Sequence, residues 1–435
     1  MSFPVEALFA IGGLLVLMAL SVPIGVALIV VSFIGIASVL GVPAAMRLVA
    51  DMPREVVSSW ELSAVPMFLL MGSIALYGGM TDALFRAARL WLGWLPGGLA
   101  VAANMAATGL GAATGSSMAT TVAVGRISIP EMTRARYDIG LAAATCASAG
   151  TIAALIPPSI PFIVYAMLAE QSLVKLFAAG VVPGLLTAFA YIVLIIVRCK
   201  LNPELAPHSD ERASWKERLA ILPEVWPLPV LVIVVFGGLY GGYVGPTEAG
   251  AFGAFIALVI AVAKGKMSFA IFRKCLRESA STTALILFVA IGAVMLARYV
   301  ALVGLPDAIT AFMTASDVSP TVLLIVTAIV YLILGMFLDP MGLMLLSLPI
   351  FLPLYATMGF DLIWFGVIVV KFIEIGLLTP PLGMNVFAVR SILPNDVSLG
   401  RIYGAIGWFL LAEAVVMFLL MAFPQISLWL PNRIG

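Results

Sequence analysis

Long apolar stretches without charge are the feature that most constrains this chain. No charged residue stands between Glu6 and Arg47, and similar uncharged runs occupy 279–297, 318–338, 340–360 and 414–432. The first run has 40 residues, and each of the later four is near the roughly 20 that a helix needs to cross a bilayer. With 63% hydrophobic residues and a mean hydropathy of +1.16, the chain is outside the range of soluble domains. We predict an all-α polytopic membrane protein with about ten or more spanning or half-spanning segments.

The sequence lacks the residue patterns that several classes of function require. Cys146, Cys199 and Cys275 show no paired spacing and the only histidine, His208, stands in a polar stretch, so we expect no disulfide frame, Cys/His metal cluster or histidine catalyst. A serine nucleophile in "TGSSM" would have no histidine nearby, and the Gly-Lys-Ser/Thr loop of ATP-driven motors is missing. The net charge of +1, with scattered basic residues, argues against nucleic acid. We predict that the protein is not an enzyme.

An internal repeat divides the chain. The charged and proline-rich stretch 198–223 lies near its middle. At an offset of 223 positions four prolines fall on four others: Pro23 on Pro246, Pro130 on Pro353, Pro157 on Pro380 and Pro158 on Pro381. We interpret 1–200 as a first repeat, 201–225 as a cytoplasmic linker and 226–435 as a second repeat. Duplicated units with matching breaks are typical of secondary transporters, and a duplicated channel or scaffold is the alternative.

Charge predicts opposite orientations for the two repeats. The first repeat has five arginines within 86–136: Arg86, Arg89, Arg126, Arg134 and Arg136. The matching part of the second repeat, 305–361, has Asp307, Asp317 and Asp361, and no Lys or Arg occurs from 299 to 360. Because basic loops stay in the cytoplasm, we expect the first region inside, the second outside, and the repeats inverted.

Each repeat contains a predicted re-entrant hairpin. In the first, at about 93–130, "GLGAATGSSMATT" (109–121) combines three glycines with Ser and Thr, and we place the tip at 114–117. Close helix packing through small residues is the alternative. In the second, at about 319–358, Asp339 lies 223 positions after Ser116. Asp339 either binds a cation or a proton, or caps the helix that starts at Pro340, and both interpretations stay open.

A broken helix follows each hairpin. In the first, at about 136–168, we expect a helix to about Ile156, a break at Pro157-Pro158 and a restart near Ser159. The last carbonyls before the break suit a small hard cation such as sodium, and the free N–H groups at the restart suit a carboxylate. A proline kink without a ligand is the alternative.

The second broken helix, at about 362–390, contains "GLLTPPLGMN" (376–385). Gly376, Thr379, Gly383 and Asn385 surround its two prolines. Just before the break, Lys371 and Glu374 are three residues apart, and we expect them to pair with each other on one helical face.

Five long motifs resemble one family. They are "GAATGSSMATTVAVGRISIPEM" (111–132), "GTIAALIPPSIPFIVYAMLAEQSLVKLFAAGVVPGLL" (150–186), "GPTEAGAFGA" (245–254), "FLDPMGLMLLSLPIFLP" (337–353) and "GLLTPPLGMNVF" (376–387). In sequence and order they resemble the large membrane subunit of tripartite ATP-independent periplasmic (TRAP) transporters, over nearly the whole chain.

The resemblance implies a multi-pass protein of the bacterial inner membrane. It would take up an organic anion, such as a C4-dicarboxylate, a sialic acid or a keto acid, driven by sodium. Two hairpins and two broken helices would slide past a scaffold as an elevator. Its expected partners are a small four-helix membrane subunit on a separate chain and a periplasmic substrate-binding protein, which largely selects the substrate. A stand-alone ion-coupled carboxylate or inorganic-anion transporter of related two-hairpin architecture is the alternative.

The resemblance also implies two sodium sites. The first would use Thr114, Ser116, Ser117, Gly150, Thr151, Ile156 and Pro157, and the second Gly335, Asp339, Gly376, Thr379, Gly383 and Met384. The family more often has serine at the position of Thr114, but the hydroxyl is kept. The substrate would lie between the two hairpin tips, and Ser117, Asp339, Thr379 and Asn385 are the candidate residues for binding it.

Overall fold

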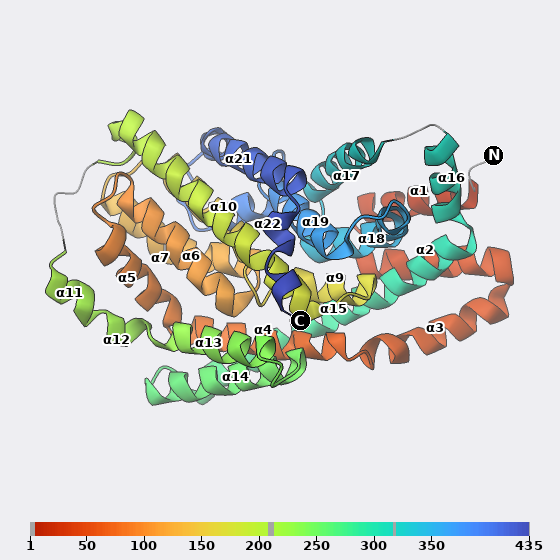
Figure 1. Cartoon of the computed structure of the whole chain (residues 1–435), viewed down its shortest axis with the longest axis horizontal. Helices are drawn as coiled ribbons and strands as arrows, with labels where there is room; N and C mark the ends of the chain where they lie inside the picture. Colours follow the sequence, from red (N-terminus) through yellow and green to blue (C-terminus); the bar gives the residue numbers. More distant parts are fainter. Residues whose placement is uncertain (1–4, 208–212, 316–318, 435) are drawn as a thin grey trace.

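The computed structural model describes residues 5–207, 213–315 and 319–434, and every regular element in these ranges is helical (Figure 1). His208 and Asp317 lie outside the described residues. The helices up to the linker are α1 (Val5–Ala19), α2 (Ile24–Leu40), α3 (Val42–Val57), α4 (Ala64–Tyr77), α5 (Met80–Leu92), α6 (Gly98–Thr114), α7 (Ser117–Arg134), α8 (Ile139–Ile152), α9 (Ile160–Ala169) and α10 (Leu173–Leu201). Those that follow are α11 (Trp215–Ala220), α12 (Leu222–Val225), α13 (Pro227–Tyr240), α14 (Pro246–Ala263), α15 (Phe269–Leu302), α16 (Leu305–Ala315), α17 (Pro320–Gly335), α18 (Pro340–Thr357), α19 (Leu362–Gly376), α20 (Met384–Arg390), α21 (Leu399–Ala422) and α22 (Gln425–Leu428). Short 3₁₀ turns occupy Glu61–Ser63, Pro203–Leu205 and Pro431–Arg433.

The helical lengths fit a membrane protein whose segments do not all cross. By length and composition, 5 helices of the described part can span a bilayer: α10, α14, α15, α18 and α21. The number rises to 7 if two bent pairs each count as one span: α3 with α4, bent by 57°, and α11–α12 with α13, bent by 50°. Other apolar helices, such as α8, α9 and α17, have only 10–17 residues. The prediction of an all-helical membrane protein is confirmed, and many of its segments are too short to cross alone.

The helices recur at the offset that the prolines show. Helix α7 begins at Ser117 and α18 at Pro340, and α8 begins at Ile139 and α19 at Leu362, so both pairs of helices start 223 positions apart. The residues just before α8 and α19, Asp138 and Asp361, each accept hydrogen bonds from backbone N–H groups of the first turn. Such caps begin both helices at the equivalent residue.

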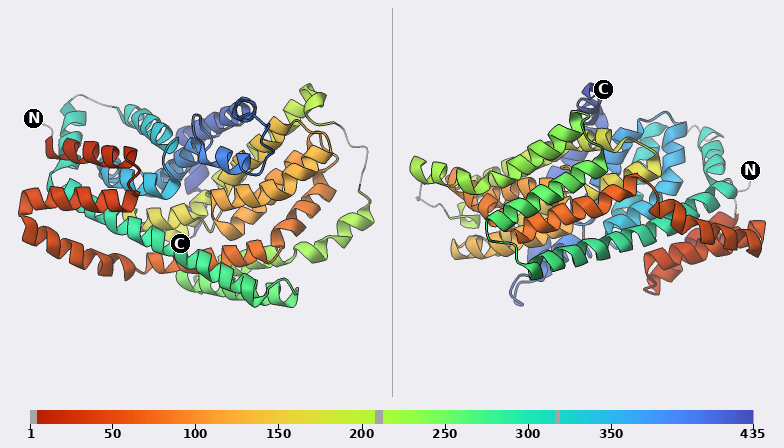
Figure 2. Two further views of the ribbon diagram at one scale, coloured as in Figure 1. Left: turned by 180° about the vertical axis from the view of Figure 1, so that it is seen from behind. Right: turned by 90° about the horizontal axis from the view of Figure 1, so that it is seen from below.

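The arrangement of the helices brings both halves into one interior. Helix α10 crosses the molecule diagonally and packs against α6 and α8 of its own half and α19 and α21 of the other (Figure 1). The 34-residue helix α15 passes α2 and α4 along one side (Figure 2). Helix α8 is rich in Ala and Gly, and all its residues from Gly140 to Ile152 are buried. Small side chains let its neighbours approach closely, as is usual for membrane helices.

Both predicted breaks are present, and one begins earlier than expected. Helix α8 ends at Ile152, not at about Ile156. Pro157 has no N–H to donate to the Ala153 carbonyl, so the last regular helical bond runs from Ile156 N–H to Ile152 O. Tight turns follow, in which Ala153 N–H donates to Gly150 O (3.0 Å) and Leu155 N–H to Ile152 O (3.0 Å). Ser159 caps the restarting helix α9, as its predicted position requires.

The two breaks differ in their surroundings. Both contain a cis bond between adjacent prolines. The first pair, Pro157 and Pro158, is buried, whereas the second, Pro380 and Pro381, is exposed. The Tyr403 hydroxyl is hydrogen-bonded to the carbonyls of Pro381 (3.0 Å) and Leu382 (2.5 Å), which ties this break to α21.

Candidate functional site

The first hairpin tip is docked onto the first break. The carbonyl of Gly115, between α6 and α7, accepts a hydrogen bond from Ile160 N–H at 3.2 Å. Gly115 has a φ of +59°, and a Cβ there would lie 2.0 Å from the Pro158 carbonyl oxygen. Both the conformation and the close approach require glycine. The first hairpin tip and the first break therefore pack backbone against backbone.

The tip also reaches the second broken helix. The Asn385 side-chain amide, in α20, donates to Ser117 Oγ at 2.8 Å and to the Ala147 carbonyl at 3.4 Å. Asn385 is fully buried, and its Oδ1 has no hydrogen-bond partner in the described part of the chain. Two predicted substrate residues, 268 positions apart, are thus in direct contact.

Part of the predicted first sodium site comes together. A Cβ on Gly150 would lie 2.8 Å from the Ser117 carbonyl oxygen and 1.8 Å from Thr121 Oγ1, so α8 and α7 touch there. The Thr121 hydroxyl is buried without a partner among the described residues, and sequence reasoning missed it. No hydrogen bond within the described ranges ends on the carbonyls of Ile156 or Pro157. Buried oxygens without partners are what a cation site requires.

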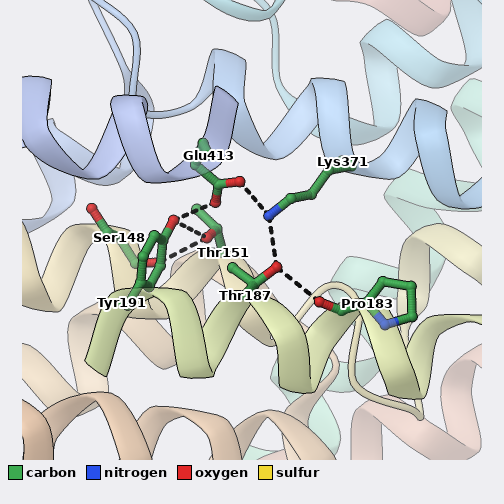
Figure 3. A network of polar contacts seen from close by, with 7 residues as sticks. All are labelled: Ser148, Thr151, Pro183, Thr187, Tyr191, Lys371 and Glu413. Atoms are coloured by element: carbon green, nitrogen blue, oxygen red, sulfur yellow. Dashed lines mark hydrogen bonds and ion pairs between the residues drawn. The ribbon is translucent and has the colours of Figure 1, made fainter. Parts of the chain in front are cut away.

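Other predicted ligands of the first site bind their own surroundings. Thr114 Oγ1 contacts Thr120 Oγ1 at 2.8 Å, and Ser116 caps α7. The Thr151 hydroxyl donates to Ser148 O at 2.7 Å and lies 3.4 Å from the Tyr191 hydroxyl (Figure 3). It therefore points toward α10, so a contribution of Thr151 to a sodium site would come from its backbone.

The second hairpin meets the second broken helix through two glycines. A Cβ on Gly376 would lie 2.8 Å from Gly335 Cα, so the backbones of α17 and α19 touch at this point. Asp339 accepts a hydrogen bond from Gly342 N–H at 3.0 Å and caps α18. The capping interpretation of Asp339 is confirmed, and its role in binding sodium stays a prediction.

The remaining candidates lie along the second break. Thr379 lies just beyond the end of α19, and its hydroxyl donates to the Ile375 carbonyl in the last turn of that helix at 2.7 Å. Gly383 has a φ of +56° and accepts from Val386 N–H at 2.8 Å, and Met384 is the first residue of α20. This geometry ends one half-helix and starts the next.

A cavity of about 220 Å³ lies between the two hairpin tips. Ser116 and Ser117 line it from the first tip, Asp339 and Pro340 from the second, and Glu374 from α19. Thr379 and Asn385 are not among its lining residues. A larger opening of about 620 Å³ shares Ser116 and extends past Asp82, Arg126 and Glu278. No basic side chain of the described residues lines the cavity between the tips.

The predicted pair of Lys371 with Glu374 is wrong. Lys371 Nζ forms an ion pair with Glu413 of α21 and donates to Thr187 Oγ1 of α10 at 2.9 Å (Figure 3). The side chains of Lys371 and Glu413 are 0% and 1% exposed. The Tyr191 hydroxyl donates to the other oxygen of Glu413. Packing of α19 between α10 and α21 offers Lys371 these tertiary partners, which outcompete its neighbour in sequence.

Glu374 is left without a hydrogen bond. It is fully buried, and neither carboxylate oxygen has a partner among the described residues. The sequence does not indicate this position, because the spacing of Lys371 and Glu374 predicts a local pair instead. Glu413 could have been found from the sequence, because it is an acidic residue inside an apolar helix. The same reasoning made Asp339 a candidate.

An ion pair at the helix ends joins Asp138, the residue before α8, to the first turn of α21. Arg401 Nη2 lies 2.6 Å from Asp138 Oδ2. Burial raises the pKa of the Asp138 carboxyl, but the hydrogen bonds from Arg401 and from Leu141 N–H outweigh it, so the pKa lies below its usual range. Asp138 is thus charged at neutral pH and caps α8.

The sequence profile of one family covers nearly all of this structure. The family described as "Tripartite ATP-independent periplasmic transporter, DctM component" matches residues 11–426. The chain belongs to this family of TRAP transporters. It is a multi-pass protein of the bacterial inner membrane, a large permease component and not an enzyme.

Curated TRAP permeases are similar over most of their length. The C4-dicarboxylate TRAP transporter large permease protein DctM of Pseudomonas aeruginosa is 36% identical over 401 residues, 90% of this chain and 91% of that protein. The sialic acid permease SiaM of Vibrio cholerae is 30% identical, over 86% of this chain and 87% of that one. The ectoine/5-hydroxyectoine permease UehC of Ruegeria pomeroyi is 32% identical, over 96% of both.

Solved transporters share the fold of this TRAP permease. The Alcanivorax borkumensis YdaH transporter superimposes with a TM-score of 0.61 at 12% identity, over 90% of this chain and 91% of that one. Neisseria gonorrhoeae MtrF gives 0.59 at 14% identity, over 88% and 85%. At such identities the likeness concerns the fold alone.

Proposed function

We propose that this TRAP permease couples the uptake of an organic anion to the inward movement of sodium. The observation that carries the proposal is the cavity between the hairpin tips, which Asp339 and Glu374 line and no described basic residue does. At 4 Å and an effective dielectric constant of about 20, two like charges repel by about 4 kcal/mol. An anion therefore binds beside these carboxylates only when cations neutralise them. Bound sodium supplies that charge, beginning with Asp339 at the second break.

The sodium gradient also provides the energy. Each positive charge that enters the cell gains about 2.3 kcal/mol per 100 mV of membrane potential. Two or more sodium ions for each anion then drive the anion steeply uphill. The free carbonyls of Ile156 and Pro157 and the contact of Gly335 with Gly376 support sodium positions at the two breaks.

We further propose an elevator movement. Two contacts cross between the halves, from Ser117 to Asn385 and from Lys371 to Thr187, and the ion pair of Lys371 with Glu413 lies within the second half. Together they tie the first hairpin to the second broken helix, and that helix to α10 and α21. Helices that share buried hydrogen bonds and an ion pair move as one body, because separating them would expose unpaired charges to lipid. In the proposal, this body slides past a scaffold that includes α2, α4, α14 and α15.

The substrate and partners follow from membership in a tripartite family. The relatives' names indicate C4-dicarboxylates, sialic acid and ectoines as their substrates, and we propose a small organic acid for this permease. A periplasmic binding protein delivers it, and a small four-helix membrane subunit on a separate chain completes the transporter.

Reconstitution tests this proposal. Proteoliposomes would contain the permease and its small subunit, with binding protein outside and labelled C4-dicarboxylates, sialic acid or keto acids as probes. We expect uptake only when all three proteins are present. Uptake that persists without binding protein would favour the stand-alone transporter instead.

A further inference from the structure

Glu374 is the buried charge that the proposed sodium sites do not use. It lies in the last turn of α19, is fully buried and lines the cavity between the hairpin tips. Neither carboxylate oxygen has a hydrogen-bond partner in the described part of the chain. A carboxylate taken out of water without a partner is strongly destabilised, so Glu374 either takes up a proton or holds a cation.

The charges around Glu374 do not balance. Lys371, Glu374 and Glu413 are all buried, and in their ionised forms they would carry one positive and two negative charges. Glu413 and Thr187 hold the Lys371 ammonium group on the α10 side (Figure 3). The lysine that stands three residues before Glu374 is therefore committed elsewhere. An ionised Glu374 would need one further positive charge, and no basic residue of the described ranges lines this cavity.

Oxygen atoms are available beside Glu374. Ser117 and Glu374 line the same cavity. Ser117 Oγ in turn accepts a hydrogen bond from Asn385, whose own Oδ1 is buried without a partner among the described residues. Carboxylate, hydroxyl and amide oxygens are ligands for hard cations.

We propose that Glu374 is the anionic ligand of a third sodium site, which faces the cavity beside the Ser117 hydroxyl. The inference rests on the proposed sodium coupling. It adds a sodium site that is separate from the two sites proposed at the breaks. Glu413 and Thr187 have a positioning role in this site, since they keep the Lys371 ammonium group away from Glu374. Sodium at Glu374 completes the neutralisation of the cavity wall before an anion binds there.

Direct counting of bound sodium tests the site. Equilibrium binding of ²²Na⁺ to the purified permease with its small subunit, in choline buffer, would be compared with that of Glu374→Gln. Glutamine keeps the shape of the side chain and removes its charge. We expect the variant to bind one sodium ion fewer per chain than the wild type. Glu374→Asp, which keeps the charge on a shorter side chain, should bind the full number with weaker affinity.

Thermal unfolding gives a second readout. Because glutamine removes an unpaired buried charge, Glu374→Gln should melt at a higher temperature than the wild type in sodium-free buffer. Added sodium should raise the melting temperature of the wild type more than that of the variant. The control is Glu248→Gln in α14, where a glutamate oxygen is also buried without a partner in the described ranges but lies outside the cavity. That variant should bind as much sodium as the wild type.

The outcomes separate this inference from the proposed function. A wild-type protein that binds no ²²Na⁺ would overturn both. If the wild type binds sodium and Glu374→Gln binds the same number, the third site is wrong while sodium coupling stands. The same conclusion follows if Glu374→Gln fails to fold, because an unpaired charge is dispensable for folding. The site is also excluded if wild type and Glu374→Gln bind the same number of sodium ions and only the wild-type binding changes with pH. That result would indicate that Glu374 is protonated and does not bind sodium.

Discussion

Replacement of Lys371 by methionine should strongly destabilise the permease. Methionine keeps the apolar length of the side chain and leaves Glu413 as a buried charge without its ion partner. Since the pair is 0% and 1% exposed, we expect the cost of about 3–5 kcal/mol that is typical of breaking a buried pair. This corresponds to roughly two to three and a half orders of magnitude in the unfolding equilibrium.

Removal of both charges tests which partner Lys371 has. The double variant Lys371→Met/Glu413→Gln should regain most of the lost stability, because no unpaired charge remains on that side. Lys371→Met/Glu374→Gln should show much weaker coupling between its two changes. SDS titration in mixed micelles, followed by circular dichroism, measures each unfolding free energy. Arg298→Met is the control: it breaks an ion pair with Glu55 whose side chains are 42% and 54% exposed, and it should cost about 0–1 kcal/mol.

Two results would refute this reasoning. One is a cost below about 1 kcal/mol for Lys371→Met, which would mean that the ion pair is solvated. The other is strong coupling of Lys371 to Glu374 and none to Glu413, which would restore the pairing expected from the sequence.

Three further predictions follow from the site. Gly115→Ala should abolish uptake, because its Cβ would meet a carbonyl oxygen of the first break at 2.0 Å and its φ is +59°; uptake at the wild-type rate would contradict the docked tip. Ser117→Ala and Thr379→Ala should each raise the sodium concentration that gives half-maximal uptake while the protein stays folded, and wild-type sodium responses in both would show that the two sites are misassigned. Arg401→Met should raise the pKa of Asp138, whose lowered value contributes stability above the unfolded pKa that is lost as pH falls. Melting temperatures between about pH 6 and 3 should therefore fall at a higher pH in this variant than in the wild type, and coincident curves would refute the assignment.

Sequence patterns predicted the elements but not all of their partners. Turn and cap residues such as Gly115, Ser159 and Asp339 act locally, so the chain alone indicates where the hairpin and the half-helices begin. The repeat offset was visible because prolines mark the same breaks in both halves.

Long-range contacts decide the features that sequence reasoning missed. Lys371 had an acidic neighbour at helical spacing, yet its partners come from helices some 40 and 180 positions away, which only packing brings together. Packing also decides two other contacts. The Thr151 hydroxyl lies beside Tyr191 of α10, and Ser117 contacts Asn385 of the second half. Periodicity cannot indicate which of several neighbouring helices a polar side chain will face.

The initial rate of substrate uptake with and without an inward sodium gradient tests the central claim most directly. Proteoliposomes with the permease and its small subunit would be supplied with substrate-loaded binding protein, and sodium outside would be replaced by choline at constant ionic strength. We predict uptake against the substrate gradient with sodium, faster when the interior is negative, and none with choline. Uptake at the same rate in choline would contradict sodium coupling.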